Sequence, residues 1–465
     1  MWISSRVFGP AAIGLAFALL GSSVGAQVAG GGPTAVAMAG CGGDLARLSP
    51  LSGWQARWPA ELAQVSRLDA AGRAAALARW RAAPGALDAD LAALRPGGAP
   101  AAVAGRVREQ IGGLLQGPIA PELTDPDWRA FLDGDLREAI VRFERHLATA
   151  YVSAAPDGSP LAGSAAGQAC FAGAVAQWTS MTISPEALEA AGRRDLARYR
   201  AQLADLAGIP ERELPALLER LRAGDPAARR EDILAVTRAA LARAEAAAPR
   251  AFGDIAIAPL SVTPIAANLE ATLPAGFYAP ADGAAPARYD INLSRPADRR
   301  LMAEAIAFHE GVPGHHLGFV LAKAPGTFNS GFVEGWGIYA EHLAEELGLY
   351  STRQDRMGAA AKHLWASARL VIEPGLHVRG WSRAQAIVFL RENSALSEAE
   401  AAVEVDRYLA MPGQSVAYML GHDVIAEARA RTERRQGAAF DLAAFHRAVL
   451  EPGPRPLARL AAEFP

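Results

Sequence analysis

The sequence predicts a mainly α-helical protein with one small β-sheet. Three observations lead to this fold class. Long segments rich in Ala, Leu and Arg carry apolar residues at helical spacing, loops rich in Gly and Pro interrupt them, and one short region alternates apolar and polar residues as strands do. With 465 residues, of which 51% are hydrophobic, the chain is long enough to bury a large core.

Helical spacing is clearest in the N-terminal half of the chain. The helical segments are residues 62–94, 135–152, 185–207 and 211–248, and loops are expected at residues 84–85, 95–98 and 156–158. We therefore expect an N-terminal helical region over residues 27–250 and a second region over residues 251–465, together forming one compact two-lobed unit.

Residues 252–293 differ from these helices. Ile255, Ile257 and Leu260 are spaced as in a strand, and Tyr278 and Tyr289 lie in further short runs of the same kind. A helix is expected directly afterwards, so the sequence predicts a small sheet beside that helix.

The helix after the predicted sheet has a recognisable start. Pro296 and Asp298 suit a first helical turn, where a missing N–H is harmless and a negative charge meets the helix dipole. Leu301, Ala305 and Phe308 then form an apolar stripe. His309 and Glu310 are therefore expected at the C-terminal end of this helix.

Residues 309–316 read His-Glu-Gly-Val-Pro-Gly-His-His, which indicates a metal-hydrolase centre. In an H-E-x-x-H helix the two His lie four residues apart and reach one ion. Here the residue four positions after His309 is Pro313. Pro313 and Gly314 predict that the helix deforms or ends between the His residues. Either His315 or His316 is then expected to turn back towards His309, with Glu310 as the general base.

Glu334 is the predicted third ligand. The chain can turn after the motif and return on a second helix, expected over residues 333–347 with Gly348 after its end. Glu334 and Glu341 share one face of that helix, two turns apart. Glu341 is expected either to hydrogen-bond a ligand His or to be a solvated helix residue.

Downstream segments supply candidate polar groups that could line the predicted metal centre. Ser382 and Ser397 each begin a capping box, so helices are expected to start there, and His377 is expected in the loop before the first of them. His377 and Tyr418 are candidate hydrogen-bond donors to a developing oxyanion, the alternative being a capped His and a core Tyr.

Two further residues are candidates for substrate binding. Gln414 is expected in a loop and Arg407 on the helix before it. Arg407 is expected either to neutralise a substrate carboxylate or to pair with Glu404 or Asp406 on its own helix. The remaining residues His146, His342, His363, His422 and His446 are isolated at helical positions and are expected to be packed or surface residues.

Several motifs together resemble a known family. Residues 309–315 match H-E-x-x-P-G-H, residues 334–341 match E-G-W-x-x-Y-x-E, residues 375–382 match G-x-H-x-x-G-W-[ST], and residues 404–408 and 412–414 match E-V-x-R-Y and P-G-Q. This set resembles the bacterial "domain of unknown function 885" family, which is grouped with the gluzincin-type zinc metallopeptidases. The likeness covers residues 270–430.

The resemblance implies roles for individual residues. It favours His309, His315 and Glu334 as Zn²⁺ ligands and Glu310 as the base, with His316 as a reserve ligand. It also implies a helical gluzincin-like metallohydrolase with a deep cleft. In such enzymes an edge strand holds an extended peptide, so Tyr289, in residues 289–293, is a candidate for substrate binding, the alternative being that this strand is part of the core.

The N-terminus indicates export. Arg6 precedes an apolar run over residues 11–20, and small residues at 24–26 suit a cleavage site, so residues 1–26 are predicted to be a removed signal peptide, an uncleaved anchor being the alternative. No Cys lies at the cleavage site, which argues against a lipoprotein. Cys41 and Cys170 are expected either to form one disulfide in an oxidising compartment or to remain buried thiols.

Composition limits the partners. A net charge of −3 and a pI near 6.3 give no electrostatic footprint for nucleic acid, and no membrane association is expected after signal removal. We expect a periplasmic or secreted zinc metallopeptidase acting on short peptides. The alternatives are a zinc hydrolase of a non-peptide amide or ester, and a binding protein without catalysis. The sequence predicts no oligomeric state.

Overall fold

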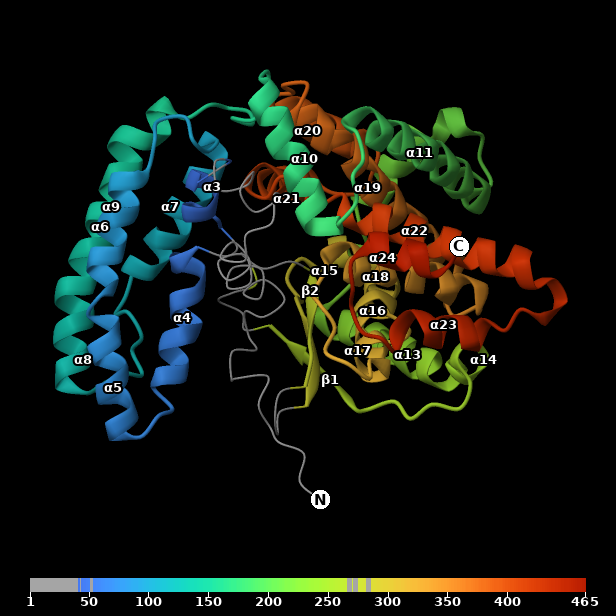
Figure 1. Ribbon diagram of the computed structural model, residues 1–465, viewed down its shortest axis with the longest axis horizontal. Helices are drawn as coiled ribbons and strands as arrows, with labels where there is room; N and C mark the ends of the chain where they lie inside the picture. The colour runs from blue at the N-terminus through green and yellow to red at the C-terminus, as the bar shows by residue number, and fades with distance from the viewer. Residues whose placement is uncertain (1–40, 42, 51–52, 266–269, 271–274, 282–285) are drawn as a thin grey trace.

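Helices dominate the structure, a computed structural model that describes residues 41, 43–50, 53–265, 270, 275–281 and 286–465. Figure 1 shows two parts, a smaller helical lobe in blue and teal and a larger body that holds the sheet and the C-terminal helices. The predicted mainly α-helical class with a small sheet is confirmed. The predicted signal peptide over residues 1–26 lies outside the described residues.

The smaller lobe is built from short helices around an aromatic core. Trp54 packs edge-on against Phe143, with ring centroids 5.4 Å apart, and Trp128 and Leu132 are buried beside them. Burial of such large apolar side chains is the main source of stability for helices as short as these. The lobe consists of α3 (Gly43–Arg47), α4 (Trp54–Val65), α5 (Ala70–Trp80), α6 (Ala83–Ala93), α7 (Ala101–Leu115), α8 (Pro126–Phe131), the π-helical turn η1 (Leu132–Leu136), α9 (Arg137–His146) and the π-helical turn η2 (Leu147–Tyr151).

The larger body is organised around α18, which Figure 1 shows among α16, α19 and α22. Helices α18 and α22 approach closely because Gly335 faces Gly421, and a Cβ on Gly335 would lie 2.4 Å from the Gly421 carbonyl carbon. The helices before the sheet are α10 (Ala165–Thr179), α11 (Pro185–Ala207), α12 (Leu214–Arg222), α13 (Arg230–Ala247) and α14 (Pro249–Phe252). Those after it are α15 (Pro296–Arg299), α16 (Ala303–Glu310), α17 (His315–Leu321), α18 (Ser330–Glu346), α19 (Arg353–His377), α20 (Arg383–Glu392), α21 (Glu398–Ala410), α22 (Ala417–Gln436), α23 (Leu442–Leu450) and α24 (Leu457–Glu463).

The predicted sheet has the strand order β1-β3-β2 in the described part of the chain. Its strands are β1 (Leu260–Pro264), β2 (Gly276–Ala279) and β3 (Ala287–Ile291). Strand β3 runs parallel to β1 and antiparallel to β2, with Tyr289 opposite both Val262 and Tyr278. The prediction that residues 289–293 form an edge strand is therefore wrong. Tyr289 lies on the central strand, whose backbone is already paired on both sides.

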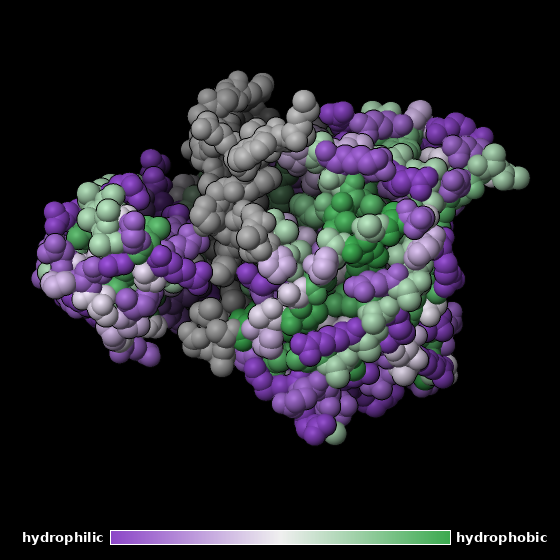
Figure 2. Space-filling model, turned by 90° about the horizontal axis from the view of Figure 1, so that it is seen from below, coloured by the Kyte–Doolittle hydropathy of each residue, from purple (hydrophilic) through white to green (hydrophobic). Residues whose placement is uncertain are grey.

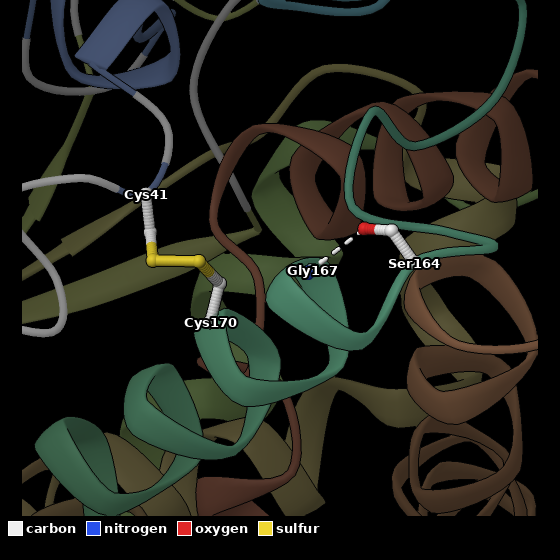
Figure 3. Close-up of a disulfide and its surroundings, with 4 residues drawn as sticks. All are labelled: Cys41, Ser164, Gly167 and Cys170. Carbon is white, nitrogen blue, oxygen red and sulfur yellow. Dashed lines mark hydrogen bonds between the residues drawn. A yellow bond between two sulfur atoms is a disulfide. The ribbon is translucent and has the colours of Figure 1, made fainter.

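A disulfide and an ion-pair cluster connect the two parts. Cys41 and Cys170 are bonded, which decides between the two expectations for the cysteines and ties the start of the described chain to α10, whose first turn is capped by Ser164 (Figure 3). Asp406 on α21 accepts hydrogen bonds from Arg106 on α7 and from Arg383 on α20. The lobe is thus held to the body by covalent and charged contacts.

The helix predictions differ in accuracy. The segment 185–207 coincides with α11, and the capping boxes at Ser382 and Ser397 are both present. The loop expected at residues 84–85 is wrong, because Pro84 lies in the first turn of α6, where its missing N–H costs nothing. The segment 211–248 is divided into α12 and α13.

The two parts differ in the hydropathy of their surfaces. The view in Figure 2 shows hydrophobic residues gathered on the larger body and rimmed by hydrophilic ones, whereas the smaller lobe is mostly hydrophilic on that face. Among the described residues, no helix combines the length and the apolar character needed to cross a bilayer.

One hydrophobic core contains residues from both sides of residue 250, such as Leu188 and Leu370. The division of the chain predicted at residue 250 stays a prediction.

Candidate metal centre

The predicted helix break lies between the two candidate His ligands. Helix α16 ends at Glu310, and α17 begins at His315 after a short link that contains a cis bond before Pro313. The link folds the chain back, so the rings of His309 and His315 lie with centroids 4.6 Å apart. The helix is broken as expected, and the break brings a second imidazole to the side of His309.

Gly314 and Trp336 fix the shape of the link. A Cβ on Gly314 would lie 1.9 Å from the carbonyl oxygen of His309, so only glycine allows this approach. The indole Nε1 of Trp336 on α18 donates to the carbonyl oxygens of Pro313 and Gly314, at 3.0 and 3.2 Å. The link is therefore held against the helix that carries Glu334.

Glu334 lies between the two imidazoles. Its Oε2 is 3.3 Å from His309 Nε2 and 3.6 Å from His315 Nε2. Burial alone would raise the pKa of Glu334, but the hydrogen bonds from His309 and His315 outweigh it and hold that pKa well below its usual range. The carboxylate is thus anionic and ready to bind a cation.

Glu310 lies at the edge of the same cluster. Its Oε2 is 4.0 Å from His315 Nε2, and ligand atoms of His309, Glu310 and His315 all lie within 4.8 Å of one another. The carboxylate also accepts a hydrogen bond from the backbone N–H of Tyr278 on β2. Burial, together with the charge of Glu334, raises the pKa of Glu310 to about 7 although His315 opposes the shift. A group with this pKa both accepts and releases a proton near neutral pH.

Glu341 orients His309 from behind. Its Oε1 accepts a hydrogen bond from His309 Nδ1 at 2.7 Å and from Lys362 Nζ at 2.5 Å, and its Oε2 is bonded to His363 Nε2 at 3.1 Å. Burial opposes ionisation, but the charge of Lys362 and these hydrogen bonds hold the pKa of Glu341 well below its usual range. With Nδ1 donating to Glu341, Nε2 of His309 is the ring nitrogen that faces the cluster, and its lone pair would serve a metal ion in place of the hydrogen bond to Glu334.

Three contributors to this arrangement were not predicted from the sequence. Lys362 and His363 come from α19 and secure Glu341, and Gly337 lies one turn after Glu334, where a Cβ would be 2.3 Å from the His309 ring. A glycine between Glu334 and Glu341 on the same helical face was the available signal. His363 also stacks on His342, and the ring of His342 lies tilted beside that of His422 with centroids 4.6 Å apart, so these three are packed residues, as expected, and they contact one another.

The reserve ligand His316 points elsewhere. Its Nε2 donates to the carbonyl oxygen of Ala258 at 2.7 Å, and its Nδ1 lies 3.3 Å from the hydroxyl of Tyr278. The side chain is fully buried, and burial lowers its pKa. The structure therefore brings His315, and not His316, to the cluster.

Tyr418 borders the centre, and Tyr289 lies beneath it. The ring of Tyr418 stacks on that of His309 with centroids 6.2 Å apart, and burial and the charge of Glu334 raise its pKa. Its hydroxyl makes no hydrogen bond to any residue in the described ranges. Tyr289 is buried, and burial and the charge of Glu310 raise its pKa. Tyr289 is thus near the base but is a core residue of the sheet.

His377 does not join the cluster. It is the last residue of α19, so its expected loop position is wrong; the helix continues through Pro374. Its Nδ1 is bonded to the Ser159 hydroxyl at 2.7 Å, and its Nε2 faces the Tyr408 carbonyl at 3.2 Å. Both ring nitrogens are engaged in a fully buried site, which matches the alternative of a capped His and argues against an oxyanion donor.

Arg407 and Gln414 are bound to each other. Arg407 also donates to Glu404 at 2.8 Å, and Gln414 donates to the hydroxyl of Ser330 at the start of α18 at 3.3 Å. Arg407 therefore takes the second of its two expected roles, the ion pair with Glu404.

The donor set fits a zinc ion. Two atoms bound to one tetrahedral Zn²⁺ at about 2.1 Å lie about 3.4 Å apart, close to the separations of Glu334 from the two imidazoles. Two imidazoles and one carboxylate leave a fourth position for water, and such a nitrogen and oxygen set suits zinc. The composition and spacing of the cluster therefore fit a zinc ion.

Comparison with known proteins places the chain in a family. A model of a bacterial protein of unknown function, DUF885, matches residues 16–464. The chain belongs to the DUF885 family. A search of curated proteins found no match.

Solved structures share the fold of this DUF885 member. One is described as a "putative lipoprotein" from Colwellia psychrerythraea, with 24% identity and a TM-score of 0.67 over 81% of this chain and 69% of that chain. Another is a "putative lipoprotein" of unknown function from Shewanella oneidensis, with 18% identity and a TM-score of 0.67 over 87% of this chain and 81% of that chain.

Proposed function

We propose that this DUF885 protein is an exported zinc-dependent hydrolase, most simply a peptidase of short peptides. One observation carries the proposal: Nε2 of His309, Nε2 of His315 and Oε2 of Glu334 converge, with the carboxylate of Glu310 beside them. A structural metal site uses all its positions for protein ligands, whereas this set leaves one for water.

The residues divide the chemical work between them. A zinc ion held by His309, His315 and Glu334 would polarise the substrate carbonyl and acidify a water molecule. Glu310 takes the proton as the water oxygen attacks the carbonyl carbon, and it delivers that proton to the leaving nitrogen as the carbon–nitrogen bond breaks. Glu341 holds His309 in one tautomer throughout, and Tyr418 offers a hydroxyl to the substrate oxygen.

Two further parts of the proposal concern the shape of the site and export. A gluzincin-like deep cleft, which would admit short peptides, is implied by the motif resemblance alone. Export is supported by the charged and apolar pattern of residues 1–26 and by a disulfide, which persists in oxidising compartments. The names of the two similar structures also point to the cell envelope.

A peptide-library digest tests the proposal. Zinc-loaded protein is incubated with a mixed library of short peptides and cleavage is read by mass spectrometry, with Glu310→Gln as the inactive variant and Glu346→Gln, at the exposed end of α18, as the matched control. We expect wild type and Glu346→Gln to cleave equally and Glu310→Gln to lose about three orders of magnitude in turnover while retaining zinc.

The outcomes separate the candidate functions. Cleavage of esters or non-peptide amides, without peptides, would point to the other zinc hydrolase. Absence of any hydrolysis by a fully zinc-loaded protein would contradict the proposal, and so would full activity in Glu310→Gln.

A further inference from the structure

A buried cluster with an excess positive charge lies next to the metal centre. It contains the guanidinium groups of Arg369 and Arg407, and among the residues that the structure describes Glu404 is the one carboxylate that pairs with both. Arg369 is 4% exposed, and the aromatic rings around it carry no charge. Arg369 is buried and Arg407 is half-buried, and two such cations that share one anion leave an uncompensated charge, which is costly unless a further anion binds there.

The guanidinium of Arg369 is oriented for one more partner. Its Cζ lies 4.3 Å from the ring centroid of Trp365 and 4.3 Å from that of Tyr418, so two aromatic rings pack against it, and its N–H groups point along its edge. Along that edge Nε donates to the Tyr408 hydroxyl at 3.1 Å and Nη2 donates to Glu404 at 3.3 Å. Nη1 makes no hydrogen bond to any residue of the described ranges.

Tyr418 connects this cluster to the metal centre. Its ring contacts Arg369 as well as stacking on the ring of His309. Its hydroxyl likewise makes no hydrogen bond within the described part of the chain. Both Tyr418 and Trp365 are half-buried, so the free edge of Arg369 adjoins two rings that reach solvent. By contrast Arg407 directs all three of its nitrogens to Glu404 and Gln414.

From these contacts we propose that Arg369 binds a carboxylate of the substrate, with Nη1 as the donor and the Tyr418 hydroxyl beside it. The inference rests on the proposed hydrolase function and gives its substrate class: short peptides or amides that carry a carboxylate near the cleaved bond. The carboxylate is either the C-terminal group of a peptide or the side chain of an acidic residue. A guanidinium packed against two rings and hydrogen-bonded through two of its nitrogens has little rotational freedom left to lose on binding a planar anion.

Equilibrium binding tests the inference without turnover. Three probes are titrated by calorimetry into zinc-loaded Glu310→Gln and into metal-free wild type: acetyl-Ala-Ala, its C-terminal amide, and acetyl-Ala-Glu amide. We expect at least one of the two acids to bind tenfold or more tightly than the uncharged amide. Tighter binding of acetyl-Ala-Ala assigns the subsite to a C-terminal carboxylate, and tighter binding of the Glu peptide assigns it to an acidic side chain.

Variants locate the subsite. Arg369→Gln, made in both backgrounds, is expected to remove the preference for the acid, whereas Arg369→Lys retains part of it because the charge remains. Arg356→Gln, on the exposed start of the same helix, is the matched control and keeps the full preference. Melting curves and zinc content show whether each variant is folded and loaded.

The inference and the proposed function can fail separately. Equal binding of both acids and of the uncharged amide to wild type would overturn the inference even if zinc-dependent hydrolysis is present, and so would an unchanged preference in Arg369→Gln. A preference that depends on Arg369, in a protein without hydrolase activity, would support the subsite and overturn the function.

Discussion

The smaller lobe and the metal centre bury side chains of opposite character. The lobe encloses Trp, Phe and Leu side chains, whereas the centre encloses ionisable groups, among them Glu341, Lys362 and His363. Apolar burial stabilises a fold without specifying a chemical site, but a buried charge costs stability unless each partner is in place. The lobe therefore supports the fold, whereas the stability of the centre depends on the presence of each partner in its network of charges.

The first prediction concerns two adjacent His residues of the centre. His315→Ala is expected to weaken zinc affinity by a hundredfold or more, because it removes a ligand. His316→Ala is expected to retain stoichiometric zinc and to lose stability. The substitution leaves the carbonyl oxygen of Ala258 without a hydrogen-bond donor and opens a cavity in the buried interior. Zinc titration with a competing chelator measures both. Loss of zinc in His316→Ala alone would exchange the two assignments.

The second prediction concerns the lobe. Trp128→Ala is expected to lower the free energy of unfolding by about 3 to 5 kcal/mol, because the Trp128 side chain is almost fully buried among apolar neighbours. Urea titration measures the loss. Zinc content of the folded protein should stay at the wild-type level; a variant that folds fully and loses zinc would break the distinction between the two parts.

The third prediction compares one glycine from each part. Gly337→Ala is expected to weaken zinc affinity about tenfold, because its Cβ would displace the His309 ring. Gly105→Ala on α7 has no atom within 4 Å of the new Cβ and is expected to stabilise the protein by about 0.5 to 1 kcal/mol. The two are measured by zinc titration and by urea unfolding. Unchanged zinc affinity in Gly337→Ala would show that the ring tolerates the shift.

The fourth and smallest effect concerns Asp195, an acid near His422 and Asp423. Burial, together with the charge of Asp423, raises the pKa of Asp195 to about 6, and its Oδ2 has no hydrogen-bond partner in the described ranges. A raised pKa means that the folded state binds the proton more tightly than the unfolded state. At low pH the carboxyl group is protonated in both states and its charge costs no stability. The cost of the buried charge grows between about pH 4 and pH 6 and is constant above that range.

The corresponding variant is Asp195→Asn. It is expected to raise the free energy of unfolding by about 1 kcal/mol at pH 7.5, after allowance for solvent screening, and to change it little at pH 4. Urea titrations at the two pH values measure this. An equal gain at both pH values would show that the charge of Asp195 is not the cause.

The sequence predicted those parts of the site that depend on local geometry. Pro313 and Gly314 must interrupt a helix, and Glu334 and Glu341 must share a helical face, so both features follow from residue type and spacing. The choice between His315 and His316 could not be made from spacing, because it depends on the path of the link that Trp336 holds.

Contacts between remote segments account for the remaining differences. Lys362 and His363 reach Glu341 from α19, and nothing near Glu341 in the sequence indicates them. Alternation predicted the strand around Tyr289, but the order of strands, which makes it central, is a property of the whole sheet. The same holds for His377, whose partner Ser159 is more than two hundred residues away.

The central claim is that His309, His315 and Glu334 hold one zinc ion with Glu310 beside it. A crystal structure of the zinc-loaded protein, with anomalous scattering recorded at the zinc edge, tests this most directly. We predict one peak per chain, in contact with Nε2 of His309, Nε2 of His315 and the Glu334 carboxylate. Absence of a stoichiometric ion, or an ion bound without Glu334, would contradict the account.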